Sequence, residues 1–315
     1  MKINIFGVGR SGTKAVQLYL SYLLAKKYGS VWLNYEPFLY QNRKLRKACI
    51  RGKEIHRQMP LLLEENSLDS SLVSKTKKFG NDLVSQNEVV VSKFIRGNGR
   101  INLINQYTNP DFSLFIIRDI YEVLRSSIKA NWCMVDKHDW ERFLKEAKTI
   151  YPAIENRSYF SDKLYVVATY WYVMNKFALE NAKKLFVIKY TNLDGLYGVE
   201  CFGYNKLLKS NLKISSPRFE GSKIHTDFTI KDHKSTENTK NSQFLNKVKT
   251  KLFKDNSNQL MGNLVTINQS PNIQEKPNFS KYKNKINVEI YKNDFLEKIS
   301  TEIDDLISER SKKFE

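Results

Sequence analysis

Residues 3–14 are Ile3-Asn4-Ile5-Phe6-Gly7-Val8-Gly9-Arg10-Ser11-Gly12-Thr13-Lys14. The apolar run at the start of this stretch predicts a buried strand, and the three glycines predict a tight loop after it. From Ser11 onward, apolar residues recur every three or four positions, which predicts a helix that ends at Gly29. Backbone N–H groups at a strand-to-helix junction face an anion, and the helix dipole adds to the attraction. We therefore expect a phosphate-type anion at this loop.

Four more apolar runs predict strands farther along the chain. They lie at Val31–Tyr35, Val89–Val91, Phe112–Ile117 and Leu185–Ile188. Amphipathic stretches with helical spacing separate them, the longest at residues 162–184. Strands that alternate with helices favour an α/β fold, in which a central parallel sheet is flanked by helices on both faces.

The last third of the chain has a different composition. Residues 219–280 are rich in Asn, Ser, Thr and Lys and show little periodicity. We expect loops with short helices there, as a mobile region inside a single domain that spans residues 1–315. Apolar residues then recur at helical spacing between Asp294 and Arg310, which predicts a final helix docked back on the sheet.

Composition limits the class of protein. The 315 residues include 52 Lys and Arg against 33 Asp and Glu, so the net charge is 52 − 33 = +19. The 41% of hydrophobic residues excludes a collagen-like or wholly disordered chain.

No apolar run approaches the roughly 18 residues of a membrane span, and no secretory leader is visible. We expect a cytoplasmic protein, with the membrane surface also open to it.

The positive net charge is typical of proteins that bind an anionic partner. Candidates are nucleic acid, an anionic membrane face and a polyanionic small molecule. A metal site is not expected. The three cysteines, Cys49, Cys133 and Cys201, form no CxxC pair, and the four histidines form no HExxH pattern.

Two common classes of phosphate-binding protein fit the glycine loop in part. As G-x-G-x-x-G it matches the dinucleotide-binding pattern, with Glu36 placed to bind a ribose, although the bulky Arg10 lies inside the turn. As a nucleoside-triphosphate loop it has Gly12-Thr13-Lys14 where that pattern needs Gly-Lys-Thr, so the magnesium-binding hydroxyl is displaced. This order argues against a kinase or GTPase.

The loop also resembles the 5′-phosphosulfate loop of the sulfotransferase family, in the residues Arg10-Ser11-Gly12-Thr13, with Lys14 where a second hydroxyl residue is usual. A second segment, Phe115 to Ser126, is similar to the 3′-phosphate motif of that family: a strand that ends in Arg-Asp-Pro, with a serine eight residues after the arginine. Arg118 and Ser126 keep this spacing, and Ile120 stands in place of the proline. Two weaker similarities follow. Tyr35-Glu36-Pro37 is similar to a segment after the second strand of the carbohydrate sulfotransferases, and residues 189–193 resemble a segment after the fifth strand of the family.

The resemblance implies a P-loop-like three-layer fold and a sulfotransferase that uses 3′-phosphoadenosine 5′-phosphosulfate (PAPS) as sulfonyl donor and no metal. It implies that the donor is bound by Arg10, Ser11, Gly12, Thr13, Lys14, Arg118 and Ser126. We expect Glu36 to be the catalytic base and Lys93 to contact the sulfonate, with His56 as the other candidate base. The acceptor would be a hydroxyl of a glycan or glycolipid, and no nucleic-acid partner is expected.

Two other functions stay open from the sequence. One is a Rossmann-type NAD(P)-dependent oxidoreductase, which the glycine pattern and Glu36 would serve. The other is a non-catalytic basic protein that binds nucleic acid or a membrane surface. Against the latter, the aromatic residues do not alternate with lysines in an RNA-binding pattern. Saturable binding of adenosine 3′,5′-bisphosphate would favour the sulfotransferase over both.

Overall fold

The structure is a computed structural model of the chain. A parallel sheet of five strands forms its centre. Its description covers residues 1–38, 46–63, 69–129, 134–156, 158–159, 163–190, 218–220, 223–225, 229–231, 263–266 and 293–312. The five strands are β1 (Lys2–Phe6), β2 (Ser30–Tyr35), β3 (Val90–Phe94), β4 (Phe112–Arg118) and β5 (Phe186–Tyr190). They lie in the order β5-β4-β1-β3-β2, and all neighbouring pairs among them are parallel.

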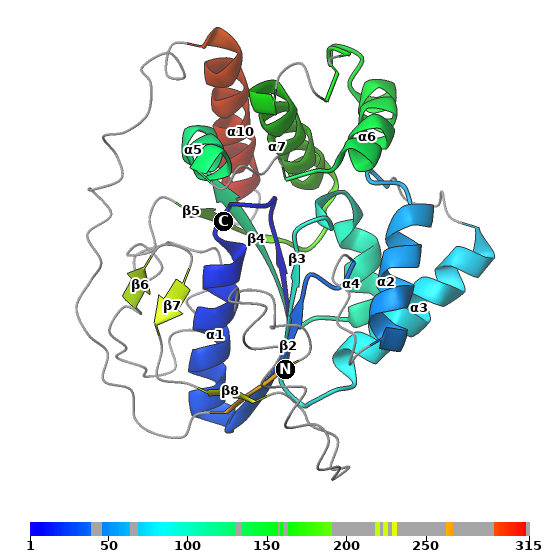
Figure 1. Cartoon of the computed structure of the whole chain (residues 1–315), viewed down its shortest axis with the longest axis vertical. Helices are drawn as coiled ribbons and strands as arrows, with labels where there is room; N and C mark the ends of the chain where they lie inside the picture. The colour runs from blue at the N-terminus through cyan, green and yellow to red at the C-terminus, as the bar shows by residue number, and fades with distance from the viewer. Residues whose placement is uncertain are drawn as a thin grey trace, which may run out of the picture.

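Helices cover both faces of this sheet, which confirms the predicted α/β architecture (Figure 1). α1 (Thr13–Tyr28) packs on β1, β2 and β3 from one side. On the other side lie α2 (Arg46–Gln58), α3 (Ser70–Val84) and α4 (Ile101–Thr108), the last preceded by the short 3₁₀ helix η2 (Asn98–Arg100). β3 is buried along its whole length, as expected for a parallel strand covered on both faces, although two of its residues, Ser92 and Lys93, are polar.

The remaining helices are α5 (Ile120–Lys129), α6 (Lys137–Ile150), α7 (Lys163–Asn181) and α10 (Asp294–Lys312). The final helix was expected to dock on the sheet, and this expectation was wrong in detail. α10 packs on α7 and α5, with Leu296, Ile299 and Ile303 buried in the shared core. An ion pair of 2.7 Å between Asp304 and Lys189 also connects α10 to β5.

The expectation of loops and short helices over residues 219–280 was also wrong where the structure describes that region. β9 (Asn263–Thr266) pairs antiparallel with β2, and β8 (Thr229–Lys231) pairs antiparallel with β9. β6 (Arg218–Glu220) and β7 (Lys223–His225) form a separate antiparallel pair. These strands have three or four residues, too few for period-2 alternation to be visible in the sequence. The rest of residues 219–280, and the side chains of Cys49, Cys133 and Cys201, lie outside the described residues.

A row of polar side chains crosses the middle of the sheet. Asn34, Ser92, Asn4 and Ser113 occupy paired positions on β2, β3, β1 and β4. Asn34 Nδ2 donates to Ser92 Oγ at 2.9 Å, and Asn4 Nδ2 donates to Thr108 Oγ1 of α4 at 2.8 Å. A shift of one residue along any strand would leave these buried groups without partners, so the row stabilises one register.

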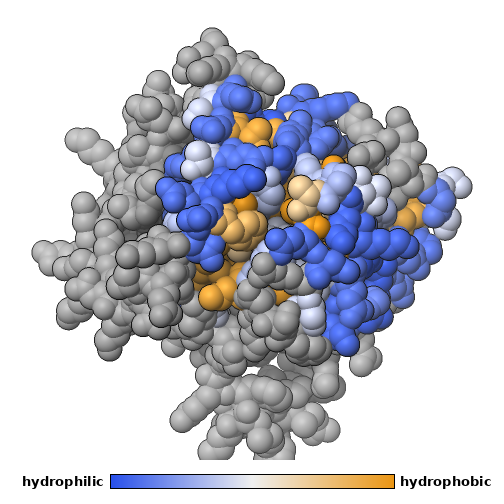
Figure 2. Space-filling model, turned by 90° about the horizontal axis from the view of Figure 1, so that it is seen from above, coloured by the Kyte–Doolittle hydropathy of each residue, from blue (hydrophilic) through white to orange (hydrophobic). Residues whose placement is uncertain are grey.

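The sheet reverses its direction of growth at β1. The chain leaves β1 through α1 toward β2 on one side, whereas it leaves β4 toward β5 on the other side. In open α/β sheets, the crevice outside the carboxyl ends of the strands at such a point is the usual place for a ligand. Figure 2 shows this edge from above: hydrophilic residues dominate the described surface, and hydrophobic residues are visible between them near its centre.

Candidate functional site

The glycine loop lies between β1 and α1, where the sequence predicts it. Gly12 caps α1 with φ 84°, a left-handed conformation that favours glycine. A side chain at Gly12 would also collide with the ring of Tyr190, because a Cβ there would lie 2.7 Å from two ring carbons. No acidic residue occupies the first turn of α1, so the positive end of the helix dipole meets no carboxylate of its own helix.

Two non-glycine residues at this edge adopt left-handed backbone conformations. Arg10 has φ 68° and Glu36 has φ 50°. Such conformations cost roughly 1–2 kcal/mol for residues with a Cβ, and they concentrate at functional sites. Both residues were predicted to take part in the site from the sequence alone, so the strain falls where chemistry is expected.

The structure brings together the two motifs that the resemblance identified. Arg10 Nε donates to Ser126 Oγ at 2.9 Å, and Arg118 Nη1 donates to the Arg10 carbonyl oxygen at 3.2 Å. The Arg118 guanidinium also lies 5.4 Å from the ring centre of Tyr190 and 3.2 Å from Glu122 Oε2. The basic residues of the loop and of the strand end thus lie next to each other at the carboxyl ends of β1 and β4.

Glu36 and Lys93 form a close ion pair next to this region. Lys93 Nζ lies 2.7 Å from Glu36 Oε1, and the Glu36 N–H donates to the Lys93 carbonyl oxygen at 2.9 Å. Lys93 is only 1% exposed. Burial lowers the pKa of Lys93 to about 8; the Glu36 carboxylate opposes this shift and the nearby Lys14 adds to it. The pair therefore keeps a positive charge and a carboxylate beside the loop.

Ser11 and Thr13, the hydroxyl residues of the loop, are both buried. Ser11 Oγ has no hydrogen-bond partner among the residues that the structure describes. A buried hydroxyl without a partner costs about 1–3 kcal/mol, so an acceptor or donor supplied by a ligand would stabilise it.

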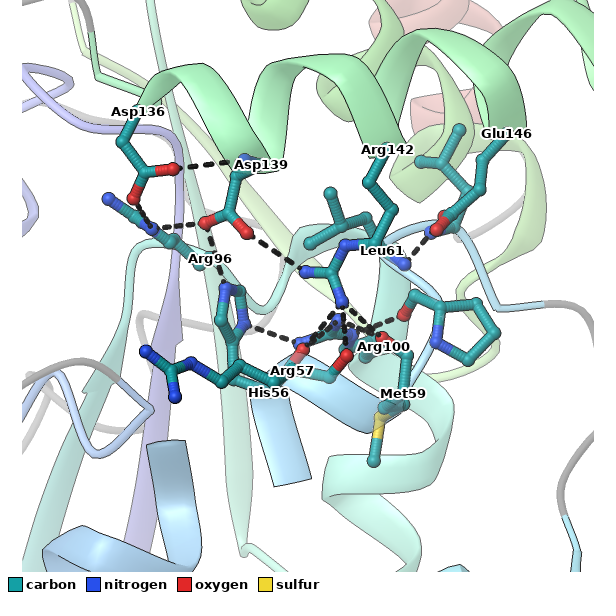
Figure 3. Close-up of polar contacts among 12 residues, drawn as sticks. His56, Arg57, Met59, Leu61, Arg96, Arg100, Asp136, Asp139, Arg142 and Glu146 are labelled. Atoms are coloured by element: carbon teal, nitrogen blue, oxygen red, sulfur yellow. Dashed lines mark hydrogen bonds and ion pairs between the residues drawn. The ribbon is translucent and has the colours of Figure 1, made fainter. Parts of the chain in front are cut away.

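His56, the other candidate base, lies inside a buried polar network (Figure 3). Its Nε2 lies 3.0 Å from Asp139 Oδ2, and its Nδ1 lies 2.8 Å from Arg100 Nη1. Because arginine can only donate, Nδ1 is the acceptor and Nε2 carries the proton. Burial lowers the pKa of His56 to about 4, against the opposing effect of the bond to Asp139. Both ring nitrogens are engaged, so this structure does not offer His56 as a base.

The same network also holds Asp139 and Arg142, which sequence reasoning did not identify. Arg96 pairs with Asp139, which Arg142 also contacts at 3.1 Å through Oδ1. Arg142 Nη1 further donates to the carbonyl oxygens of His56 and Arg57 at the end of α2. Charged residues at non-periodic positions of three separate segments give no signal that they meet. Asn98 was also missed, although the two flanking glycines mark a close backbone approach.

The described residues include neither a candidate membrane span nor a candidate metal-binding cluster. None of the helices in the described part of the chain is long and apolar enough to cross a membrane. Within the described ranges, no group of three or more His, Cys, Asp and Glu side chains is placed to hold a metal ion.

Comparison with known proteins leaves the family of this chain open. No family model matches the sequence, and no curated protein matches it. Among solved structures, thymidylate kinase from Ehrlichia chaffeensis aligns with 39% of this chain and 79% of its own, at 20% identity and a TM-score of 0.24. At this TM-score the likeness supports no conclusion about function.

Proposed function

We propose that this protein is a sulfotransferase that transfers a sulfonyl group from PAPS to a hydroxyl group of a carbohydrate or glycoconjugate. One observation carries the proposal. Arg10 of the glycine loop contacts Ser126, while Arg118 contacts the Arg10 backbone. The two segments that resemble the phosphosulfate and 3′-phosphate motifs are far apart in sequence, and they meet at one edge of the sheet.

The chemistry of the donor suits such a site. PAPS carries a phosphosulfate at one end and a phosphate at the other, so it needs two cationic regions at a fixed separation. The loop offers backbone N–H groups, the end of α1 and Lys14 for the phosphosulfate. Arg118 and Ser126 offer a forked guanidinium and a hydroxyl for the 3′-phosphate.

The transfer step needs a base and a cation, and the Glu36–Lys93 pair supplies both. The acceptor oxygen forms a bond to sulfur while the bond from sulfur to the bridging phosphate oxygen breaks. The hydroxyl proton passes to Glu36, and adenosine 3′,5′-bisphosphate leaves. Since Glu36 Oε1 takes the hydrogen bond from Lys93, the proton would pass to the other carboxylate oxygen.

A transfer assay tests the proposal directly. Purified protein is incubated with PAPS labelled in the sulfonyl group and with a panel of glycans, glycolipids and phenols. We expect labelled product with at least one hydroxyl acceptor and saturable binding of adenosine 3′,5′-bisphosphate. Binding of NAD without binding of the bisphosphate would instead favour the oxidoreductase, and absence of both would leave a non-catalytic basic protein.

A further inference from the structure

Asn98 contacts the glycine loop at Gly7. It lies in η2, directly before α4, and is 1% exposed. Its Oδ1 accepts the Gly7 N–H at 3.0 Å. Its Nδ2 is buried and has no hydrogen-bond partner within the described part of the chain. A buried amide nitrogen in this state is rare in folded proteins and calls for an explanation.

The turn that carries Asn98 is fixed by close packing. A Cβ at Gly97 would lie 2.8 Å from Phe94 Cβ, and a Cβ at Gly99 would overlap the Leu61 carbonyl oxygen. The Gly99 carbonyl oxygen accepts the Leu63 N–H at 2.8 Å. The backbone on both sides of Asn98 is therefore closely packed.

Arg100 anchors the end of this turn within the buried network (Figure 3). Its guanidinium donates to the carbonyl oxygens of Pro60 at 2.5 Å and of Met59 at 2.6 Å, and to His56 Nδ1. The network thus joins η2 to the end of α2 and, through Asp139, to α6. Such support is the usual means by which a protein holds a polar group ready for a ligand.

The unpartnered amide nitrogen lies beside the loop because it shares a carbon with the oxygen that Gly7 contacts. Ser11 Oγ, in the same loop, is fully buried and also lacks a partner among the described residues. Two buried groups that can donate hydrogen bonds thus lack partners here: the Ser11 hydroxyl of the loop, and the Asn98 amide of η2, which contacts the loop at Gly7. An oxyanion accepts several hydrogen bonds at once and would engage both.

We propose that Asn98 is a further residue of the donor site, which orients the first turn of the loop through Oδ1 and donates from Nδ2 to the oxyanion bound there. This inference rests on the proposed function in one respect, that the loop binds the phosphosulfate end of the donor. The chemical class of the ligand is a phosphate or sulfonate oxygen, and the residue acts by direct contact.

The test compares binding of three anions to purified variants by titration calorimetry: adenosine 3′,5′-bisphosphate, ATP and inorganic pyrophosphate. Asn98→Asp keeps an acceptor for the Gly7 N–H but replaces the donor with a carboxylate oxygen that repels an anion. We expect Asn98→Asp to lower the affinity for the anion that binds by tenfold or more. Asn98→Ala should lower it by about three- to tenfold. Asn105→Asp is the matched control, because Asn105 Oδ1 accepts from Asn4 and Ser113 away from the loop. The affinity of Asn105→Asp for the same anion should stay within twofold of the wild-type value.

The outcomes separate this inference from the proposed function. If Asn98→Asp binds the bisphosphate with an affinity within twofold of the wild type, the proposed role of Asn98 is wrong. The sulfotransferase proposal is then unaffected. Binding of ATP or pyrophosphate without the bisphosphate overturns the sulfotransferase, and the effect of Asn98→Asp on that anion then decides the role of Asn98. Failure of all three anions to bind overturns both. If Asn98→Asp does not fold, as judged by circular dichroism, an unchanged affinity in Asn98→Ala is sufficient to overturn the inference.

Discussion

Glu36 shows how one residue of the site is held. Its backbone is left-handed, its N–H donates to the Lys93 carbonyl oxygen, and its carboxylate pairs with the Lys93 ammonium. Two contacts to one neighbouring residue offset the conformational cost of the left-handed backbone. A carboxylate fixed in this way has little freedom to lose when a substrate binds.

We expect Glu36→Gln to lower turnover by roughly 10² to 10⁴, because the amide keeps the shape of the side chain but accepts no proton. Affinity for adenosine 3′,5′-bisphosphate should stay within about threefold, since the phosphate contacts lie elsewhere. Labelled-donor assays at saturating donor and acceptor measure the first quantity, and calorimetry measures the second. Glu141→Gln, a control on an exposed carboxylate, should change neither. Near-normal turnover in Glu36→Gln would remove Glu36 as the base.

Arg118 belongs to the phosphate-binding half of the site. We expect Arg118→Ala to weaken binding of adenosine 3′,5′-bisphosphate by about 1.5–3 kcal/mol, the usual contribution of a hydrogen bond to a charged group. Arg57→Ala removes an equal charge from an exposed side chain and should have a much smaller effect. Unchanged affinity in Arg118→Ala would contradict the assignment of the 3′-phosphate to this residue.

Sequence reasoning anticipated part of this arrangement for a physical reason. Arg10 lies in the loop after β1, Arg118 ends β4, and Ser126 lies about two turns into α5. A parallel sheet places such residues at one edge, whatever its width. The Glu36–Lys93 pair needs more information. It forms because β2 lies next to β3 with Tyr35 opposite Lys93. Neither the strand order nor the register can be predicted from the sequence of either segment alone.

At the scale of elements, the apolar runs predicted all five parallel strands, because each is long enough to show its pattern. The partners of α10 and the edge strands β8 and β9 could not be predicted. Helix docking depends on which neighbouring surface is left uncovered, and short edge strands depend on pairing with β2. The network at His56 is a third such case, since it joins α2, η2 and α6 through side chains that no periodicity connects.

This network predicts a pH dependence of stability. The pKa of His56 is lowered in the folded state to about 4, from 6.5. Between these values the unfolded chain binds a proton that the folded chain does not, so the free energy of unfolding falls as the pH falls from about 6.5 to 4. We expect a loss of up to about 3 kcal/mol for this group.

The measurement compares urea unfolding of the wild type and His56→Gln across this range of pH. Glutamine stays neutral, can accept from Arg100 and can donate to Asp139, so the difference between the two proteins isolates the histidine. His138→Gln, at an exposed position, should track the wild type. Parallel pH profiles for the wild type and His56→Gln would show that His56 titrates normally in the folded protein.

For the whole molecule, the candidate site depends on segments spread from residue 10 to residue 126, and α10 closes the core from the other end of the chain. Its residues Leu296, Ile299 and Ile303 belong to the same hydrophobic cluster as Phe6 of β1. Glu302 pairs with Lys176 and accepts from the Tyr172 hydroxyl at 2.7 Å. One continuous core implies that the end of the chain and the site unfold together.

Ile303→Ala tests this coupling. Ile303 is 1% exposed, so its truncation leaves a cavity, and we expect the free energy of unfolding to fall by about 2–5 kcal/mol. The loss should appear as a shift of a single transition, recorded alike by circular dichroism and by tryptophan fluorescence. Glu309→Ala, on an exposed position of the same helix, should shift the transition by less than about 0.5 kcal/mol. Because a ligand stabilises the folded state by mass action, adenosine 3′,5′-bisphosphate should raise the midpoint of both variants. Two transitions, of which Ile303→Ala shifts one and the bisphosphate shifts the other, would show that α10 and the site belong to separate folding units.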